Sequence, residues 1–287
     1  MVGPVTLSRR QVEEVLGARG LRPSRALGQN FVVDANTVRR VARMAGVGPG
    51  SRVVEIGAGL GALTLALADT GASVVAVEVD RHLIPLLHEQ VDSAGVRVVE
   101  ADALTLDWGT LLALPVHPDT EPWAVVANLP YNVAVPVVLR ALDEAPRVTA
   151  MLVMVQREVG ERLAAAPGSK TYGAVSVKVA YHASARVVGR VPASVFVPRP
   201  KVESVLVRID RHPEVAVDPA LVPADALFAL VRAGFAHRRK MLRRALADSV
   251  PPEAFTAAAI DPESRAENLS VGDWGRLAAC LPPASPR

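Results

Sequence analysis

Residues 52–61 read RVVEIGAGLG, in which a run suited to a buried strand is followed by three glycines at alternate positions. A strand buried between two layers of helices is continuously apolar, and glycines directly after it let the backbone turn sharply and approach a ligand closely. The run SVVAVEVD (73–80) is a second such strand, and it ends at Glu78. A carboxylate at this place in an α/β sheet can accept hydrogen bonds from both hydroxyls of a ribose. The two segments together predict a site for an adenosine-containing cofactor.

The spacing of the glycines favours one kind of cofactor. Folds that bind dinucleotides use G-x-G-x-x-G to seat a pyrophosphate at a helix N-terminus, whereas this chain has G-x-G-x-G and no P-loop lysine. The acidic Glu55 just before the loop suits a ligand that has no phosphate and has a cationic amino-acid end, such as S-adenosylmethionine. A glycine-rich loop by itself is equally consistent with an ordinary tight turn, and Glu78 at the expected interval is what favours a cofactor site.

Strand-like and helix-like patterns alternate strictly over residues 53–166. Such alternation predicts an α/β fold in which a parallel, Rossmann-like sheet is covered by helices on both faces. Two helices, from Ser8 to about Arg19 and from Asp34 to Gly46, precede the sheet. Residues 186–209 read as a final antiparallel pair of strands, and a loop is expected at residues 115–122.

A cluster of prolines at residues 212–223 separates a last Ala/Leu-rich segment from the rest of the chain. We therefore expect two domains. Residues 1–211 would contain the N-terminal helices and the sheet, and residues 212–287 would form a small, all-helical domain.

The composition excludes several classes of protein. With 287 residues, of which 50% are hydrophobic, the chain is long enough to form a real core and is not disordered. Its apolar stretches are too short to span a bilayer, and we expect a soluble, cytoplasmic protein that acts as a monomer. The single cysteine, Cys280, excludes an internal disulfide, and the six histidines show no metal-ligand spacing, so no metal is expected.

Basic residues are concentrated in two blocks, although the formal net charge is only +3. Residues 9–43 contain eight arginines and three acids, and residues 232–244 contain six Lys or Arg and no acid. Such blocks are either solvated helix faces or a surface for a polyanionic partner. If residues 238–244 are helical, one broad face carries five candidate contacts to RNA phosphates. These are Arg238, Arg239, Lys240, Arg243 and Arg244.

The tetrapeptide Asn128-Leu129-Pro130-Tyr131 ends the fourth strand, at the edge of the sheet where open α/β folds bind their ligands. The exocyclic amine of adenine is a poor nucleophile, and acceptors that hold its two N–H bonds favour a reactive geometry. The amide oxygen of Asn128 and the carbonyl of Leu129 are suitable acceptors. Pro130 fixes the turn, and Tyr131 offers an aromatic face to a flipped base. The alternative is that Asn-x-Pro simply ends a strand.

Several segments occur in an order that resembles the ribosomal RNA adenine dimethyltransferases, most of all those that act on small-subunit RNA. The segments are LGQNFVVD (27–34), VVEIGAGLGALT (53–64), EVD (78–80), EADAL (100–104), NLPY (128–131), FVPRPKVES (196–204) and FAHRRKMLRRAL (235–246). The resemblance implies a Rossmann-like class I S-adenosylmethionine-dependent methyltransferase sheet with a small helical C-terminal domain. Proline is common in the family where this chain has Ala58, and leucine where it has Val32, but neither difference removes a polar contact.

The resemblance also implies the contacts to S-adenosylmethionine. Asn30 and Val32 would contact its methionine end, Gly57 would approach it by backbone, and Glu78 would bind the ribose. Asp102 would accept a hydrogen bond from the adenine amine; as a residue that follows the third strand, it is expected beside Glu78 at the same sheet edge. Two local alternatives stay open, namely a helix N-cap at Asp102 and a local turn formed by Gln29 and Asn30.

On the same grounds, Asn128 would lie between the methyl donor and the target base, and Tyr131 and Phe196 would sandwich that base. Phe196 lies in a Pro-rich segment of a chain with only 4% aromatic residues, which favours stacking over packing in the core. A role as a core residue stays open.

The resemblance implies an enzyme that uses S-adenosylmethionine to dimethylate two adjacent adenosines near the 3' end of small-subunit (16S) ribosomal RNA during subunit biogenesis. Three alternatives remain. The chain could modify large-subunit (23S) RNA and confer macrolide resistance, act chiefly as a ribosome-assembly binding factor, or methylate adenine in DNA.

Overall fold

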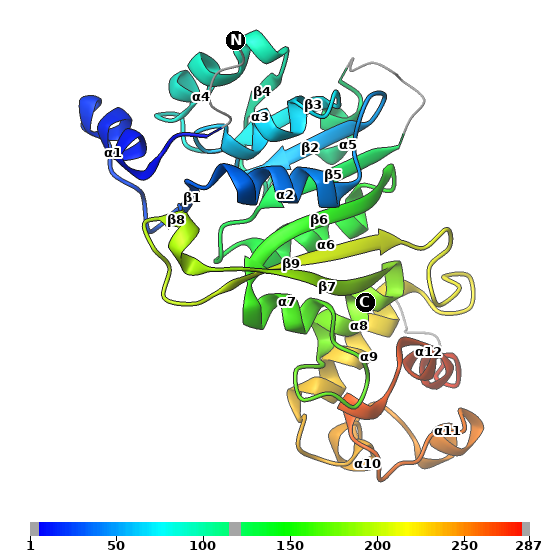
Figure 1. The fold of residues 1–287 in the computed structure, drawn as a ribbon. Coiled ribbons are helices and arrows are strands. Elements are labelled where there is room, and N and C mark those ends of the chain that lie inside the picture. Colours follow the sequence, from blue (N-terminus) through cyan, green and yellow to red (C-terminus); the bar gives the residue numbers. More distant parts are fainter. Residues whose placement is uncertain (1–5, 115–121, 283–287) are drawn as a thin grey trace. The chain divides into compact units, whose positions relative to one another are not determined.

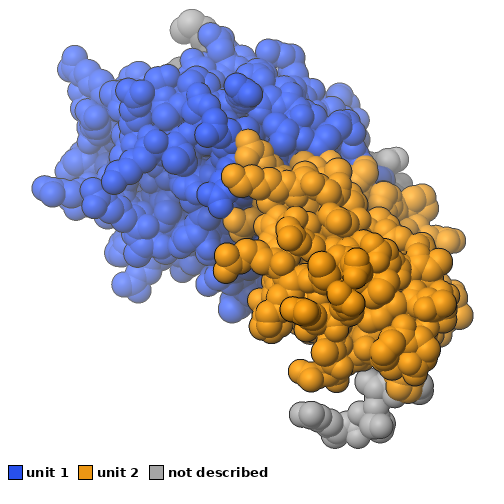
Figure 2. All heavy atoms as spheres, turned by 90° about the horizontal axis from the view of Figure 1, so that it is seen from below, with its two compact units in different colours: residues 1–160, 186–210 blue, residues 161–185, 211–287 orange. Residues whose placement is uncertain are grey.

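The computed structural model describes residues 6–114 and 122–282. The predicted loop at 115–122 therefore lies almost entirely outside the described residues. The chain divides into two compact units, which are distinguished by colour in Figure 2. The first consists of residues 1–160 and 186–210, and the second of residues 161–185 and 211–287.

A seven-stranded sheet forms the centre of the first unit, with the strand order β4-β3-β2-β5-β6-β9-β7 (Figure 1). Strands β2 to β6 pair in parallel with one another, and β9 pairs antiparallel with β6. The strands are β2 (Arg52–Ile56), β3 (Ser73–Glu78), β4 (Arg97–Glu100), β5 (Trp123–Asn128), β6 (Val148–Gln156), β7 (Ala183–Val191) and β9 (Ser204–Arg211). The predicted α/β fold is confirmed.

The central strands are buried on both faces, which explains why their sequences are continuously apolar. Val53, Val74 and Leu152 pack against α2 and α3 on one face. Val54 and Val153, which point to the opposite face, are just as deeply buried. Figure 1 shows α2 and α3 in front of the sheet and α6 behind it. The helices of this part are α1 (Arg9–Ala18), α2 (Ala35–Ala45), α3 (Ala62–Ala68), α4 (Ile84–Val91), α5 (Trp108–Leu112), α6 (Ala134–Glu144) and α7 (Arg157–Leu163), with the 3-10 turns η1 (Asp92–Ala94) and η2 (Ala193–Val195).

A second, two-stranded sheet joins segments that are far apart in the sequence. Strand β1 (Phe31–Val32) pairs antiparallel with β8 (Phe196–Val197), so that Val32 lies opposite Phe196. The segment before β1, residues 21–30, has no regular secondary structure. We call residues 24–30 the strap, because they cover the ligand-binding edge of the sheet described below.

The second unit is helical around a core that contains the fully buried Trp274. A Cβ on Gly234 of α9 would lie 2.5 Å from the Cη2 atom of Trp274 on α12, so only glycine allows these two helices to approach so closely. The helices are α8 (Ala174–His182), α9 (Ala224–Ala236), α10 (Leu242–Ala245), α11 (Pro252–Ala257) and α12 (Val271–Ala279), with the 3-10 turn η3 (Ala266–Asn268).

Two expectations about this region differ from the structure. Residues 161–185, which the sequence assigned to the first domain, belong to the second unit, where α8 packs on α9. The expected single helix over residues 238–244 is wrong, because only residues 242–244 are helical, as the start of α10. Helix α9 ends at Ala236, the amide of Lys240 closes a turn onto the carbonyl of His237, and Met241 is extended and pairs with Arg265 before α10 begins.

Candidate active site

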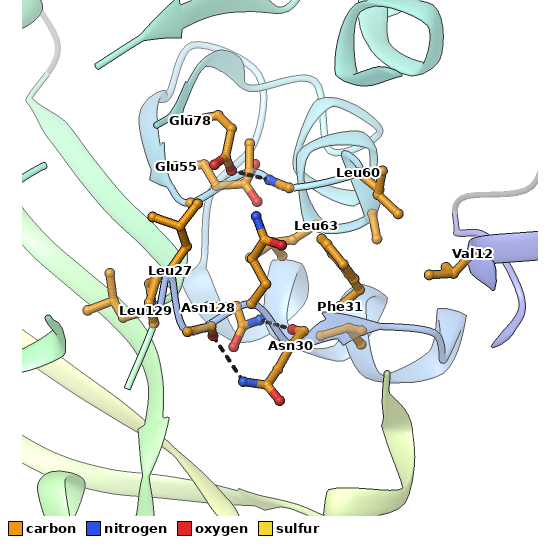
Figure 3. Close-up of a pocket in the computed structure, with 18 of the residues that line it drawn as sticks. Val12, Leu27, Asn30, Phe31, Glu55, Leu60, Leu63, Glu78, Asn128 and Leu129 are labelled. Carbon is orange, nitrogen blue, oxygen red and sulfur yellow. Dashed lines mark hydrogen bonds between the residues drawn. The ribbon is translucent and has the colours of Figure 1, made fainter. Parts of the chain in front are cut away.

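The strand order reverses between β2 and β5. From β2 the chain continues outward to β3 and β4, and from β5 it continues the other way to β6. Open α/β sheets bind ligands outside the carboxyl ends of the strands at such a switch point. A cavity lies at this place in the first unit (Figure 3). Its lining includes Asn30, Val32, Gly57, Glu78, Asn128, Leu129, Pro130 and Tyr131 from the predicted set. We call this the main cavity.

The glycine loop after β2 needs glycine for two separate reasons. Gly57, Gly59 and Gly61 have φ values of +75°, +58° and +80°, in the left-handed region that favours glycine. A Cβ on Gly59 would also lie 3.2 Å from the ring of Phe31, which comes from β1 and lines the same cavity. The loop therefore needs glycine both for its own turn and for its close contact with Phe31 of β1.

Glu78 accepts three hydrogen bonds from backbone amides, one of them from the glycine loop. Its Oε2 accepts from the Gly59 amide at 2.7 Å, and its Oε1 accepts from Val79 at 3.0 Å and Asp80 at 2.9 Å. The side chain is buried, and this burial raises the pKa of Glu78, while the amide donors act in the opposite direction. A carboxylate can accept about four hydrogen bonds, so capacity remains for a ribose hydroxyl.

Glu55 is the most deeply buried acid of the main cavity, with 1% of its surface exposed. Its Oε2 has no hydrogen-bond partner among the described residues. The pKa of Glu55 is raised to about 8, mainly by burial and also by the nearby charge of Glu78, while a hydrogen bond from the Thr64 side chain acts in the opposite direction. No lysine, arginine or histidine is among the described residues that line the main cavity. Two carboxyl groups without a basic partner favour a cationic ligand.

Asp102 lines an adjoining depression, which we call the side cavity. It shares Leu27, Gly57, Val79 and Pro130 with the main cavity, so the two cavities adjoin, and we call them together the groove. The Asp102 side chain is exposed and its Oδ1 accepts from the Leu104 amide at 2.8 Å. No helix begins there, so the alternative of a helix N-cap is excluded. The half-exposed Val79 and Leu104 give the side cavity apolar surface suited to a purine.

Asn128 is oriented by the strap. Its side-chain Nδ2 donates to the backbone carbonyl of Asn30 at 3.0 Å, and the side chain of Asn30 in turn donates to the carbonyl of Gly28 at 3.0 Å (Figure 3). With its nitrogen engaged, Asn128 has its amide oxygen left as an acceptor.

Further side chains hold the strap in place, and the sequence analysis missed them. Gln29 donates to Asp80 at 2.7 Å and accepts from the Ser24 amide at 2.7 Å. Asn132 donates to the carbonyl of Ala26 at 3.1 Å. Asn132 follows NLPY directly in the sequence, but nothing local to it indicates a partner 106 residues away.

The two predicted stacking residues differ in their surroundings. Tyr131 is half-buried at the main cavity, and its hydroxyl shares a hydrogen bond of 2.9 Å with the buried Ser204. Phe196, by contrast, is 0% exposed and packs with Val38 and Leu206 in the core beside the sheet. It is absent from the described lining of both cavities, and we do not retain it as a stacking residue.

Two of the five predicted RNA-contacting residues form ion pairs with acids, and the other three are exposed. Arg238 pairs with Glu267 at 2.8 Å and also donates to the carbonyl of Lys170, so it holds a loop of its own unit. Arg243 pairs with Glu263 at 3.0 Å. Both acids come later in the chain, so the expectation of a face without acids is wrong. Arg239, Lys240 and Arg244 are exposed, and the described residues offer them no ion pair.

The described residues contain no group of three or more His, Cys, Asp or Glu side chains placed to hold a metal ion. They also contain no helix with the length and apolar character needed to cross a membrane.

Comparison with known proteins gives a consistent result. Residues 21–282 match the profile of the ribosomal RNA adenine dimethylase family. The chain is 49% identical to a ribosomal RNA small subunit methyltransferase A of Cutibacterium acnes, over 91% of this chain and 90% of that protein. It is 47% identical to a protein of the same name from Kineococcus radiotolerans, over 96% and 92% of the two chains.

Two solved structures share the fold. The 23S rRNA methyltransferase ErmE is 26% identical, with a TM-score of 0.67, over 88% of this chain and 99% of that one. A dimethyladenosine transferase from Plasmodium falciparum is 22% identical, with a TM-score of 0.70, over 86% and 95% of the two chains.

Proposed function

Because the chain belongs to the ribosomal RNA adenine dimethylase family and is a methyltransferase, we propose that it dimethylates two adjacent adenosines near the 3' end of small-subunit (16S) ribosomal RNA. Relatives named for the small subunit are 49% and 47% identical to it, whereas the 23S enzyme ErmE is 26% identical. This difference favours the small subunit over the large one as the substrate.

The methyl donor in this proposal is S-adenosylmethionine. Asn30, Val32 and Gly57 would contact its amino-acid part in the main cavity, with Glu78 on the ribose and Asp102 on the adenine in the side cavity. The observation that carries this assignment is the groove at the switch point, which contains two buried carboxyl groups and no basic side chain among its described lining. When bound, the donor supplies an electrophilic methyl group on a positively charged sulfur.

The protein's own contribution to the transfer is mainly alignment. Asn128 would accept a hydrogen bond from the target amine through the amide oxygen that its bond to Asn30 leaves free. The carbonyl of Leu129 would accept the second N–H, Pro130 would hold this turn, and Tyr131 would stack on the base. An acceptor that strengthens as positive charge develops on nitrogen lowers the barrier, and precise positioning removes much of the entropic cost.

We further propose that the C-terminal helical segment binds RNA through Arg239, Lys240 and Arg244, which are exposed. Arg243 can join them if its exposed pair with Glu263 opens, since exposed ion pairs contribute little. Arg238 would support the loop rather than contact RNA. Two further predictions are that the protein acts in the cytoplasm and that it is a monomer. Light scattering measures the oligomeric state.

The test is methyl transfer to defined substrates. Purified protein and labelled S-adenosylmethionine are incubated with unmethylated small subunits, mature small subunits and naked large-subunit RNA. We expect label only in the first, recovered as dimethyladenosine. Label mainly in large-subunit RNA supports the macrolide-resistance alternative. Stable binding to small subunits without any label supports a role as an assembly factor.

A further inference from the structure

The N-terminal block of basic residues, 9–43, has no part in the function proposed above. Its arginines differ in their partners. Arg10 pairs with Glu14 on the same helix, and Arg19 pairs with Glu89 on α4. The arginines of α2, by contrast, are exposed and have no ion pair with any described residue. Their charges are therefore available to a partner outside the chain.

Helix α2 gathers these arginines on one side. The residues that face the sheet are apolar and buried, namely Val38, Val41, Ala42 and Ala45. Residues three and four positions apart are neighbours on a helix, so Arg39 and Arg40 both lie beside Arg43 on the opposite side. The helix itself contains no acid. Like charges at this spacing slightly destabilise a helix, so the arrangement is not explained by the stability of α2.

Strand β7 adds a fourth arginine to this surface. It is the last strand in the sheet order (Figure 1), and its sequence, ASARVVGRV, contains no acid. The Nη1 of Arg40 donates to the backbone carbonyl of Arg190 at 3.1 Å. A Cβ on Gly189 would lie 2.4 Å from Nη2 of Arg40, so glycine lets the guanidinium lie against the strand. Arg190 is itself exposed. We call the surface formed by Arg39, Arg40, Arg43 and Arg190 the α2–β7 face.

The acids next to these elements have other partners. Asp34 caps the start of α2, where it accepts from the amide and the hydroxyl of Thr37. Asp210 on β9 accepts from Arg208 and from Arg186. No acid among the described residues forms an ion pair with the α2–β7 face, which therefore presents four positive charges without a counter-ion.

We propose that the α2–β7 face is a further RNA-contact surface, within the first unit, that binds backbone phosphates of folded small-subunit RNA outside the groove. None of its four arginines is among the described lining of the main or the side cavity. Guanidinium groups bind phosphate oxygens through paired hydrogen bonds, and their binding releases the counter-ions of the RNA. The inference rests on the proposed function, which supplies the RNA.

Such a surface has a consequence for the choice of substrate. Contacts to phosphates position an RNA without reading its sequence. Because these contacts lie outside the groove, they require RNA beyond the strand that carries the target adenosines. The α2–β7 face therefore favours a large, folded RNA over a short single strand.

The test is the affinity for unmethylated small subunits, measured at several salt concentrations. The variant that combines Arg39→Gln and Arg43→Gln should flatten the slope of log affinity against log salt by about 1.4–1.8 units, at about 0.7–0.9 per contact. Its affinity for S-adenosylmethionine should equal that of the wild type. Arg190→Gln, on a different element, should flatten the slope by about half as much, and it decides the question if the α2 variant does not fold.

The matched control combines Arg10→Gln and Arg19→Gln, which removes the same charge from the same unit, but from arginines that already have ion pairs. Its slope should stay close to that of the wild type.

Three results would overturn the inference. An unchanged slope in the α2 variant means that the face is solvated, and equal flattening in the control means that net charge explains the effect. Flattening with intact subunits but not with small-subunit RNA freed of its proteins assigns the face to a ribosomal protein. If the wild-type protein neither binds nor methylates small subunits, the proposed function fails instead.

Discussion

The side-chain nitrogen of Asn128 donates a hydrogen bond of 3.0 Å to the backbone carbonyl of Asn30, across 98 residues of sequence. This bond links the end of β5 to the strap. Asn132 adds a second link, to the carbonyl of Ala26. The proposed acceptor for the target amine and the proposed contacts to the cofactor are thus parts of one hydrogen-bonded unit.

Disturbing the strap should therefore weaken cofactor binding. A Cβ on Gly28 would lie 2.8 Å from Oδ1 of Asn132 and 3.0 Å from Cβ of Pro130, whereas a Cβ on Gly20 meets nothing within 4 Å. The two glycines have similar φ values, +64° and +66°. Gly28→Ala and Gly20→Ala should each lose about 1 kcal/mol of folding free energy through backbone strain. Only Gly28→Ala should weaken the binding of S-adenosylmethionine, by about tenfold or more, as measured by calorimetry. Equal affinities in the two variants would show that the strap does not matter for binding.

Glu78→Ala should weaken binding of the cofactor by about 1.5–3 kcal/mol, the usual loss for a hydrogen bond to a charged acceptor. It should also lower thermal stability, because the amides of Gly59, Val79 and Asp80 lose their common acceptor. Binding isotherms and melting curves measure the two effects separately. Undiminished affinity for the cofactor in a folded variant would refute the assignment of the ribose site.

Glu55 should make the stability of the ligand-free protein fall as pH rises. Its pKa in the folded state is about 8, above the ordinary value of 4.5, so between these pH values the folded state holds a proton that the unfolded chain has lost. The free energy of unfolding should therefore fall by at most about 1.4 kcal/mol per pH unit, and this contribution is absent in Glu55→Gln. Urea denaturation at pH 5.5 and 7.5 should show that the free energy of unfolding of Glu55→Gln increases relative to that of the wild type as pH rises. If the difference in unfolding free energy between the variant and the wild type is the same at both pH values, Glu55 does not titrate in this range.

The exposed basic residues should determine the salt dependence of RNA binding. Replacing Arg239, Lys240 and Arg244 by alanine should flatten the slope of log affinity against log salt by about 2–3 units, at about 0.7–0.9 per contact, and leave cofactor affinity unchanged. Arg238→Ala is the contrasting variant: it should lower thermal stability, since Arg238 holds Glu267 and the Lys170 carbonyl. An unchanged slope in the triple variant would mean that these residues are merely solvated.

Local patterns were sufficient for the features that depend on neighbouring residues. The buried strands are continuously apolar, as in RVVEI, and the glycines after β2 are required by the turn that they make. The location of Glu78 and Asn128 at one edge follows from parallel pairing of their strands. These features could be predicted because each depends on a few adjacent residues and on the general geometry of α/β sheets.

Features that depend on distant partners could not be predicted in this way. Phe196 lies in a Pro-rich segment, but its pairing with Val32, 164 positions earlier in the sequence, brings it into the core. The run at 238–244 contains no acid, yet Glu267 lies 29 residues after Arg238 and pairs with it. Similarly, the partner of Asn128 is a backbone carbonyl, which no side-chain motif can indicate.

The proposed role of Asn128 is to direct methyl transfer to adenosines of small-subunit RNA. The decisive experiment is mass-spectrometric mapping of that RNA from cells that lack the protein, complemented with the wild-type protein or with Asn128→Ala. Loss of an aligned acceptor typically costs about 10²–10³-fold in rate. We predict two adjacent dimethyladenosines near the 3' end with the wild-type protein, and their absence in the uncomplemented cells and with Asn128→Ala. Full dimethylation in the uncomplemented cells would refute the proposed function, and full dimethylation with the variant would refute the role of Asn128.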